Sequence, residues 1–443
     1  MLGGMVMIKK TTMLILILAL PLLFISAGGA REAAPPAPEL EITGEKYVPD
    51  QQVTLEYWHS YTGIREELFK TFVEEFEQEN PMIKINLTYG GSLHLMRDKL
   101  VTAIAGGAGP DIAEIDSFWT PIFAESDSLV NLAPFIDAYG YDQADLFQAS
   151  FDSTQYKGNT YSIPFNLSNI VLYWNKEKFA EAGLDPDVPP KDWDEFIEFG
   201  KKLTLDRTGN GVTDQWGLAM PIRADFGAVW YWLAFFWQQE GELFNPQLTE
   251  ATFNSPAGVA ATQLWQDLVW EHGILSLDVG FADFPVGNAA MGLSSTTSYG
   301  SFQNALGADN VGVSPPPKGK TIASVSGGGN LAILEGAKDY LAAWEFLNFL
   351  GSSDVHVRWC LTTGAMPYRP SVMDIPEYQE FYQADPYLEI MLSGLEHTIV
   401  RPNIAQYSDA SRIIAEAVEE SVFERRDPET LLDRAKREVD RLF

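Results

Sequence analysis

The chain has 443 residues, of which 46% are hydrophobic and 12% aromatic, and its formal net charge is -31 at pH 7. This length predicts two large domains, and the apolar content is ample for packed cores. A chain this acidic repels nucleic-acid phosphates and anionic lipid surfaces, so we expect no nucleic-acid partner. The single cysteine, Cys360, excludes an intrachain disulfide and a thiolate metal cluster, and we expect a buried, inert thiol.

The N-terminus carries the pattern of a secretory targeting segment. Lys9 and Lys10 precede the apolar run Met13–Phe24, which is too short to span a bilayer comfortably. We expect residues 1–30 to be a signal peptide, with an uncleaved anchor as the alternative, and residues 31–50 to be an Ala/Pro-rich tether. No cysteine follows the apolar run, so we expect a periplasmic or extracellular protein without a lipoprotein cysteine.

The first part of the mature chain alternates between strand and helix patterns. Period-two alternation predicts strands at Val53–Trp58 and Ile83–Tyr89, and a short apolar run predicts a third at Asp111–Ile115. Apolar residues at helical spacing predict helices at Ile64–Asn80 and Leu93–Ala105. This β-α-β-α-β order predicts a parallel sheet with right-handed crossovers.

Ligands of parallel sheets bind beyond the carboxyl ends of the strands. The side chains that follow the three predicted strands are therefore candidates for a binding site: Trp58, His59, Ser92, Asp116 and Trp119. The alternative for Asp116 is a turn or helix cap, for Trp119 packing under the next helix, and for His59 a hydrogen bond with the backbone.

The stretch Lys157–Lys178 predicts a crossing from one domain to the next. Pro164 fixes its own φ and favours extended geometry before it, and the apolar strand Ile170–Trp174 follows. Asn166 and Ser168 lie between them, and short polar side chains lose little entropy on binding a ligand. We therefore expect this segment to form the floor of a cleft, although both side chains could instead satisfy hinge backbone groups.

The later part of the chain contains clear helix starts. Asp192 is an expected N-cap with Glu195 as its capping-box partner, and Pro256 and Pro428 each follow a capping residue. Short strands are expected within Asn288–Ser295 and at Leu331–Leu334, the second directly after the glycines at 327–329.

Several phrases together resemble the extracellular solute-binding proteins, family 1, of bacterial ABC importers, typified by the maltose-binding protein. Their order and spacing hold across nearly all of the mature chain, which makes the set specific although each phrase alone is weak. The phrases are Leu55–His59 (LEYWH), Phe76–Ile83 (FEQENPMI), Ala108–Ile112 (AGPDI), Tyr161–Phe165 (YSIPF), Leu172–Lys178 (LYWNKEK), Ala182–Leu184 (AGL), Pro189–Phe196 (PPKDWDEF) and Gly364–Pro367 (GAMP).

The resemblance implies a type II periplasmic-binding-protein fold: two α/β lobes with parallel-rich sheets flanked by helices, joined by three hinge crossings and closing over a sugar. It places lobe 1 at residues 51–163 and 288–345 and lobe 2 at residues 164–287 and 346–443. The second and third crossings are expected near Phe284–Ala289 and Tyr340–Phe349. It also implies a monomer that delivers a carbohydrate to membrane permease subunits, without a cofactor and without enzymatic activity.

Within that family the chain is most similar to the glycerol-3-phosphate-binding type, through Trp58–Ser60, Pro164–Asn166 and Arg401–Asn403. It departs from this type at Leu93 and Ala365, where that type has tyrosines, and at Asp116-Ser117, where it has a Tyr-Glu pair. An acidic Asp116 would repel a phosphate, whereas a carboxylate accepts hydrogens from neighbouring sugar hydroxyls. We therefore expect a sugar or polyol, with glycerol-3-phosphate or a diester of it as the alternative.

A sugar site needs polar side chains at its rim and aromatic rings against the sugar faces. In the aromatic run at 230–237, Trp230 aligns with a ligand-side region of the family, whereas Trp232, Phe236 and Trp237 are expected in the core. The remaining candidates are Ser295, Gly327, Gly328 and Arg401. The alternative is a plain turn for the glycines and a surface salt bridge for the arginine.

Residues 206–214 contain part of a calcium-loop pattern, with oxygens at alternate positions and glycine sixth. The candidate ligands are Asp206, Thr208, Asn210 and Asp214. The twelfth position is Gly217 instead of glutamate, so Asx turns in a hairpin loop explain the pattern equally well. Nucleophile-elbow, zinc-protease and phosphate-loop motifs do not occur in the chain. Because 61 acidic residues make chance carboxylate pairs inevitable, a secreted carbohydrate hydrolase stays as an alternative of another class.

Overall fold

The structure is a computed structural model that describes residues 42–224 and 227–443. The predicted signal peptide, residues 1–30, and residues 31–41 of the predicted tether lie outside the described residues. Within the described ranges, no helix has the length and apolar content that a membrane crossing requires.

The predicted β-α-β-α-β unit is confirmed. It consists of β1 (Val53–His59), α1 (Ile64–Glu79), β2 (Ile83–Tyr89), α2 (Leu93–Ala105) and β3 (Ile112–Asp116). β1 lies at the centre and pairs in parallel with both β2 and β3. The carboxyl ends of all three strands therefore meet at one edge of the sheet.

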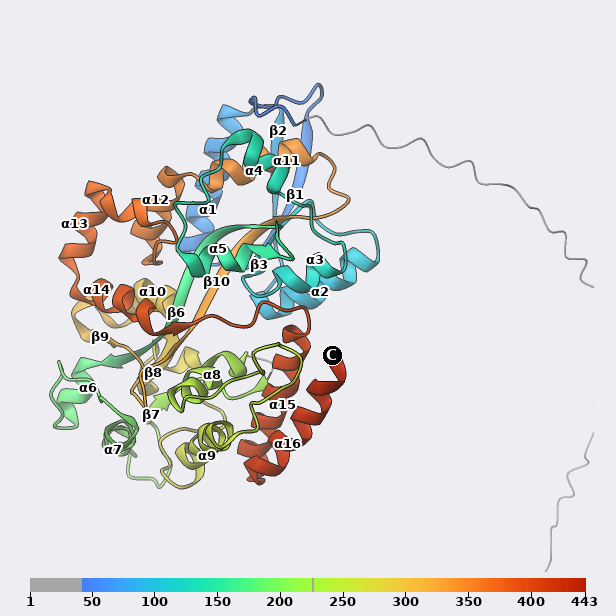
Figure 1. Ribbon diagram of the computed structural model, residues 1–443. Helices are drawn as coiled ribbons and strands as arrows, with labels where there is room; N and C mark the ends of the chain where they lie inside the picture. Colours follow the sequence, from blue (N-terminus) through green and yellow to red (C-terminus); the bar gives the residue numbers. More distant parts are fainter. Residues whose placement is uncertain (1–41, 225–226) are drawn as a thin grey trace, which may run out of the picture. The chain divides into compact units, whose positions relative to one another are not determined.

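Two long strands continue this sheet through the whole molecule (Figure 1). β10 (Ser324–Ile333) pairs antiparallel with β3 through Gly329–Ile333, and β6 (Ile163–Asn175) pairs antiparallel with β10. The second half of β6 then pairs with β8 (Ala289–Ser295) and β9 (Val311–Ser314). β6 and β10 thus pass side by side from the first lobe, which contains β1–β3, to the second lobe, which contains β7–β9.

Each lobe has its own apolar core. The core of the first lobe joins β1 and α1 to helices from late in the chain, through residues such as Leu55, Phe69, Phe346 and Trp359. The core of the second lobe contains most of the aromatic run at 230–237 packed against helices α9 (Pro256–Trp270), α15 (Tyr407–Glu424) and α16 (Pro428–Val439). Trp232, Phe236 and Trp237 are buried in this core, as predicted.

The predicted lobe boundaries differ from the structure in three places, one of which is α12 (Ser353–Thr363), expected in lobe 2 but packed in the core of the first lobe through Val355 and Trp359. β8 was expected to open the return to lobe 1, but it pairs with β7 (Trp216–Ala219) and with the second half of β6, so it belongs to the second lobe. The return crossing is β10. The helix at Tyr340–Leu350, expected as a third crossing, packs wholly in the core of the first lobe. An apolar strand or helix carries the same pattern in either lobe, and long-range pairing decides between them.

The strand at 331–334 begins earlier than predicted. β10 starts at Ser324 and includes the three glycines, because its neighbours β3 and β6 pair with it on both sides; the register shifts between Gly329 and Asn330. The glycines therefore lie inside a central strand and do not form a turn.

The helix starts follow the predicted capping residues. The side chain of Asp192 accepts a hydrogen bond from the Glu195 N–H at 3.0 Å, and that of Asp427 accepts one from the Thr430 N–H at 2.9 Å. The capping box at Asp192 is only half formed, because the Glu195 carboxylate accepts from the Lys191 N–H instead.

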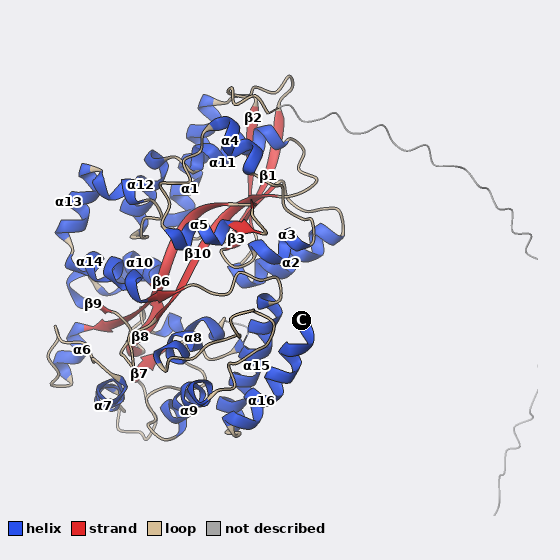
Figure 2. Cartoon of the chain, viewed as in Figure 1, coloured by secondary structure: helices blue, strands red, loops and turns tan. Residues whose placement is uncertain are grey.

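Helices flank the central strands (Figure 2). The remaining elements have the following bounds: α3 Thr120–Glu125, α4 Ala133–Tyr139, α5 Gln148–Thr154, β4 Gln155–Tyr156, β5 Asn159–Thr160, α6 Lys176–Glu181, α7 Trp193–Leu203, α8 Ala228–Gln238, α9 Pro256–Trp270, α10 Tyr299–Leu306, α11 Tyr340–Leu350, α12 Ser353–Thr363, α13 Pro376–Ala384, α14 Pro386–Ser393, β11 Thr398–Ile399, α15 Tyr407–Glu424 and α16 Pro428–Val439.

One extended segment, residues 398–406, connects α14 to α15 and is called the strap below. It begins with β11, which pairs in parallel with the start of β10, and Figure 1 shows it running across the middle of the molecule. The strap brings side chains from the late part of the chain to the carboxyl end of β3.

Candidate functional site

A cleft with a volume of about 330 Å³ lies between the two lobes. It is bounded by the carboxyl end of β3, the middle of β6, the glycines of β10, the start of α8, the turn after β8 and the strap. Its lining residues are Ser60, Arg65, Ser92, Leu93, Glu114, Asp116, Asn166, Ser168, Pro221, Gly227, Trp230, Tyr231, Phe281, Ser294, Ser295, Thr297, Ser298, Gly327, Gly328, Gly329 and Arg401.

The structure brings together nine of the twelve candidate residues from the sequence in this one cleft. They come from seven separate segments of the chain: Ser92, Asp116, Asn166, Ser168, Trp230, Ser295, Gly327, Gly328 and Arg401.

The other three candidates do not line the cleft. His59 is buried in an aromatic stack with Tyr57 and Tyr61, and its Nδ1 accepts the Tyr61 N–H at 3.2 Å. The burial of its ring lowers its pKa. Trp58 is half-buried beside α2. Trp119 is buried against Phe123, and it faces an outer groove of about 530 Å³ instead.

Asp116 and Arg401 form a buried ion pair at the cleft. Arg401 Nη2 donates to Asp116 Oδ1 at 2.6 Å and to Ser117 Oγ at 3.2 Å, while its guanidinium lies 4.0 Å from the centre of the Phe118 ring. The pair joins the strap to the end of β3, so each charge neutralises the other. Asp116 therefore has one oxygen committed to Arg401, which differs from its expected role as a free acceptor for ligand hydroxyls.

Glu114, two residues earlier on β3, is the most buried charged side chain of the cleft, with 3% of its surface exposed. Its Oε2 accepts from both the N–H and the hydroxyl of Ser60 at 2.7 Å. Burial raises the pKa of this carboxyl, while the two Ser60 hydrogen bonds act in the opposite direction. The other oxygen, Oε1, accepts no hydrogen bond from the described residues.

Four of the described residues that line the cleft carry a charge: Arg65, Glu114, Asp116 and Arg401. Asp116 and Arg401 cancel each other in their ion pair. Arg65, at the start of α1, makes no ion pair with any described residue, although its charge acts to lower the pKa of the Glu114 carboxyl. The described lining therefore holds two positive and two negative charges and is neutral overall.

The glycines of β10 let three neighbours approach the floor of the cleft. A Cβ on Gly327 would lie 2.8 Å from the Trp230 ring, and one on Gly328 would lie 2.0 Å from the Asn166 carbonyl oxygen. A Cβ on Gly329 would lie 3.0 Å from Glu114 Oε1. These glycines thus admit an aromatic ring, a paired strand and a carboxylate, which the alternative of a plain turn would not require.

Aromatic rings form part of the cleft wall. Trp230 lies against Gly327, and its Nε1 donates to the Ser326 carbonyl at 3.0 Å, which fixes the ring. Phe281 lines the cleft as well and is 49% exposed, and Tyr231 packs edge-on against Trp230. The cleft therefore offers both polar groups and apolar ring surface.

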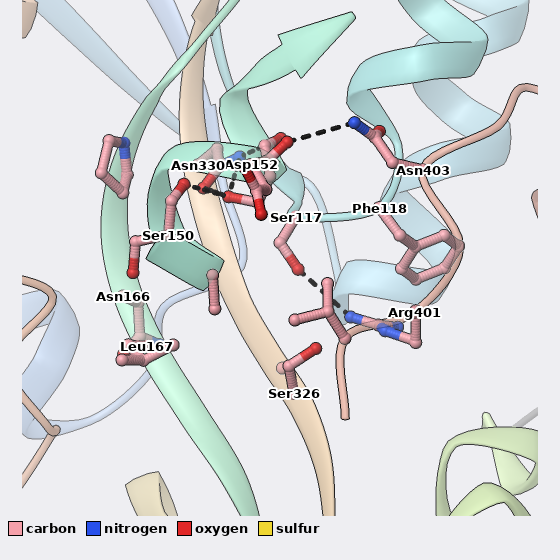
Figure 3. A pocket seen from close by; sticks show the side chains of 15 residues that line it. Ser117, Phe118, Ser150, Asp152, Asn166, Leu167, Ser326, Asn330, Arg401 and Asn403 are labelled. Carbon is pink, nitrogen blue, oxygen red and sulfur yellow. Dashed lines mark hydrogen bonds between the residues drawn. The ribbon is translucent and has the colours of Figure 1, made fainter. Parts of the chain in front are cut away.

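A second, much smaller cavity of about 30 Å³ lies beside the cleft under the strap (Figure 3). Figure 3 shows Ser117, Asn166, Arg401 and Asn403 pointing toward it, and Asn403 Nδ2 donates to the Asp152 carbonyl at 3.1 Å. This volume matches about one water molecule and is too small for a sugar, so the larger cleft is the candidate ligand site.

Residues 62–357 of the chain match the profile of the family described as bacterial extracellular solute-binding protein. The chain belongs to this family. A solute-binding protein captures its solute without transforming it, so the alternative of a carbohydrate hydrolase no longer applies.

Known relatives of this solute-binding protein bind different small molecules. The sn-glycerol-3-phosphate-binding periplasmic protein of Escherichia coli O6:K15:H31 (strain 536) is 27% identical over 354 residues, which cover 76% of this chain and 79% of that protein. An ABC transporter solute-binding protein from Thermotoga lettingae, solved with α-D-tagatose, is 25% identical, with a TM-score of 0.80 and coverage of 88% of this chain and 99% of its own.

A third relative supports the fold alone. It is a protein from Mycobacterium tuberculosis solved in complex with glycerophosphocholine, 22% identical with a TM-score of 0.77, covering 87% of this chain and 97% of its own. Together with the structure, these comparisons confirm the predicted two-lobed α/β fold of the solute-binding protein.

The loop at 206–214 has the geometry of Asx turns. Both oxygens of Asp206 accept backbone N–H groups, from Gly209, Asn210 and Gly211, and the Gly211 hydrogen bond lowers its pKa most. Asp214 accepts from the Arg207 and Thr208 N–H groups. The described residues contain no group of three or more His, Cys, Asp or Glu placed to hold a metal ion. The loop's own hydrogen bonds therefore account for its sequence pattern.

Sequence reasoning missed several lining residues, above all Glu114, Arg65 and Phe281. Glu114 had a usable signal, because it is a charged residue in the middle of the apolar strand IAEID, and burying a charge is costly. Arg65 and Phe281 had none, since an arginine in a first helical turn and a phenylalanine in a loop are common at ordinary surfaces.

Proposed function

We propose that this protein is the binding subunit of an ABC importer for a neutral sugar or polyol. One observation supports the proposal most strongly. The described lining of the interlobe cleft is neutral overall, and it combines serine and threonine hydroxyls with Trp230 and Phe281. A neutral ligand with many hydroxyls and apolar C–H faces is complementary to such a lining, because each part has a matching partner.

The hydroxyl groups of the cleft come from both lobes. Ser60 and Ser92 belong to the first lobe, and Ser294, Ser295 and Thr297 belong to the second. A ligand that bonds to both sets is held most strongly when the lobes are close together. Ligand binding would therefore stabilise the closed arrangement of the two lobes, which is the state that a transport partner could recognise.

The volume of the cleft supports a small ligand. About 330 Å³ is near the lower end of the range of roughly 300–1,000 Å³ that is typical of small-molecule sites. A monosaccharide, disaccharide or polyol fits this volume better than a long oligosaccharide does.

A glycerol-3-phosphate or glycerophosphodiester ligand is the second candidate. The glycerol-3-phosphate-binding relative favours it, and so do the N-termini of α2 and α10, which begin beside the lining residues Ser92 and Ser298. Helix N-termini attract anions. The buried carboxylate of Glu114 opposes this candidate, since it forms no ion pair with a described residue and its charge would lie beside the phosphate.

The family supports a proposal on the partners and the location. Relatives of this protein are periplasmic and belong to ABC transporters. We propose that the chain is exported through its N-terminal segment, acts outside the cytoplasmic membrane as a monomer, and delivers its ligand to permease subunits.

A thermal-shift panel tests the proposed function. Neutral monosaccharides, disaccharides, polyols, glycerol 3-phosphate and glycerophosphocholine would be added separately to the purified protein. The proposal predicts a rise in melting temperature with at least one neutral sugar or polyol, and recovery of that compound unchanged by mass spectrometry. Stabilisation by the phosphates alone would contradict it and support the second candidate.

A further inference from the structure

We propose that Glu114 determines the charge of the ligand: its carboxylate accepts hydroxyl hydrogens of a neutral ligand and repels phosphate from the cleft. This inference rests on the proposed function, and it assigns the choice between the two candidate ligands to one side chain.

The position of Glu114 leaves one oxygen available to a ligand. Ser60 occupies Oε2 with two hydrogen bonds of 2.7 Å, which hold the carboxylate in place. Oε1 lies over Gly329, where any side chain would crowd it at 3.0 Å, and it accepts nothing from the described residues. A fixed, buried acceptor with a free oxygen in a cleft is suited to a hydroxyl donor, since an unpaired buried carboxylate is costly.

Arg65 supplies the complementary donor. It lines the same cleft without an ion-pair partner among the described residues, whereas Arg401 is already paired with Asp116. A hydroxyl group both accepts and donates. A sugar hydroxyl between the two side chains could accept from the Arg65 guanidinium and donate to Glu114 Oε1, which satisfies both charges without adding one.

A phosphate cannot replace that hydroxyl at this position. A phosphate oxygen without a hydrogen cannot donate to Glu114, and its charge would lie beside a buried carboxylate in a region of low polarity. Arg65 alone would offset one of the negative charges. The charge of Glu114 is therefore the largest single cost of binding a phosphate in the described lining.

The decisive experiment is calorimetric titration of Glu114→Gln and wild type with glycerol 3-phosphate and with the neutral sugar that stabilises wild type most. Glutamine keeps the size of the side chain and removes its charge. We expect the variant to bind the sugar at least about tenfold more weakly and to bind glycerol 3-phosphate at least about tenfold more tightly than wild type does. Arg65→Gln is the matched control of opposite charge, and it should weaken the sugar without any gain for the phosphate.

The proposal is overturned if Glu114→Gln, folded by circular dichroism, binds glycerol 3-phosphate no better than wild type, whatever its affinity for the sugar. A wild type that binds none of the neutral sugars would instead refute the proposed function. If Glu114→Gln does not fold, Glu114→Ala provides the same test, because it also removes the charge and leaves no buried amide that needs hydrogen-bond partners. It should then gain glycerol 3-phosphate binding, and no gain would overturn the proposal.

Discussion

Trp230 shows how a single side chain can serve both the core and the cleft. One edge of its ring rests on Gly327, and its Nε1 is fixed by the Ser326 carbonyl. The rest of the ring contributes to the cleft wall. Because the ring is already immobile, a sugar that stacks on it loses little further entropy from the protein.

Trp230→Ala should therefore weaken binding of the neutral sugar by at least about tenfold, which corresponds to about 1.4 kcal/mol. Titration calorimetry measures this change directly. Trp270→Ala is the control, because Trp270 is partly exposed on α9 and does not line the cleft. Equal losses in the two variants would mean that Trp230 has no specific role in the site.

The candidate site could be predicted in part from single residues. Asp116, Asn166, Ser168 and Trp230 were found because each follows a strand, crossing or loop whose pattern is visible in the sequence. Glu114 was missed because it lies in the middle of a strand, whereas the ligands of parallel sheets bind beyond the strand ends. The hydrogen bond from Arg401 to Asp116 joins residues that are 285 positions apart in the sequence, and no local pattern specifies such a contact.

At the scale of elements, the strap and the two crossing strands position the site. The strap is fixed to β3 by the Asp116–Arg401 pair and to α5 by Asn403, whose Nδ2 donates to the Asp152 and Gln155 carbonyls. It therefore links an element that leads into the second lobe with two elements of the first lobe. The ion pair is nearly buried, so its two charges depend on each other.

Asp116→Asn should destabilise the protein by about 3–5 kcal/mol, because Arg401 then stays buried without its counter-charge. The double variant Asp116→Leu/Arg401→Met should be much closer to wild type, since neither charge is left unpaired. Urea denaturation measures both values. A cost below about 1 kcal/mol for Asp116→Asn would show that the pair does not hold the strap.

The close pairing of β6 and β10 makes a second prediction about elements. Gly328→Ala places a Cβ 2.0 Å from the Asn166 carbonyl oxygen, in a backbone with φ of 145°, so we expect a loss of more than about 3 kcal/mol. Gly307→Ala is the control, because Gly307 also has a positive φ, 93°, but nothing lies within 4 Å of its Cβ. It should cost only the backbone strain of about 1–2 kcal/mol. Similar losses at both positions would refute the clash.

Helix α12 carries a titratable group that affects stability. His356 is buried, its Nε2 accepts the Tyr368 N–H at 3.0 Å, and burial, with a smaller effect of Arg369, lowers its pKa well below 6.5. Its contribution to stability is present above the unfolded pKa of about 6.5 and is lost as the pH falls toward the folded value, because only the unfolded chain takes up the proton.

Between pH 7.5 and 5.5, wild type should therefore lose about 1.4 kcal/mol of unfolding free energy more than His356→Gln does. Glutamine can accept the same Tyr368 hydrogen bond but does not titrate. Urea denaturation at the two pH values gives this difference, and parallel pH profiles for the two proteins would show that His356 is protonated in the native state.

At the scale of the whole molecule, one continuous sheet connects two separately packed lobes. β10 pairs with β3 of the first lobe, β6 pairs with β8 and β9 of the second, and β6 and β10 pair with each other, so any opening of the cleft must bend these two strands. Sequence patterns correctly predicted the parallel unit of the first lobe and the crossing at β6, because these depend on local periodicity. They misplaced the return crossing, since the lobe that contains β8 is decided by pairing with β6 and β7.

The central claim is that the interlobe cleft takes a neutral sugar or polyol and not a phosphate. Isothermal titration calorimetry of the wild-type protein, with the best sugar of the thermal-shift panel and with glycerol 3-phosphate in the same buffer, tests it most directly. We predict saturable binding of the sugar, with glycerol 3-phosphate at least about a hundredfold weaker, a difference of about 2.7 kcal/mol. Binding of glycerol 3-phosphate as tight as that of the best sugar would contradict the account.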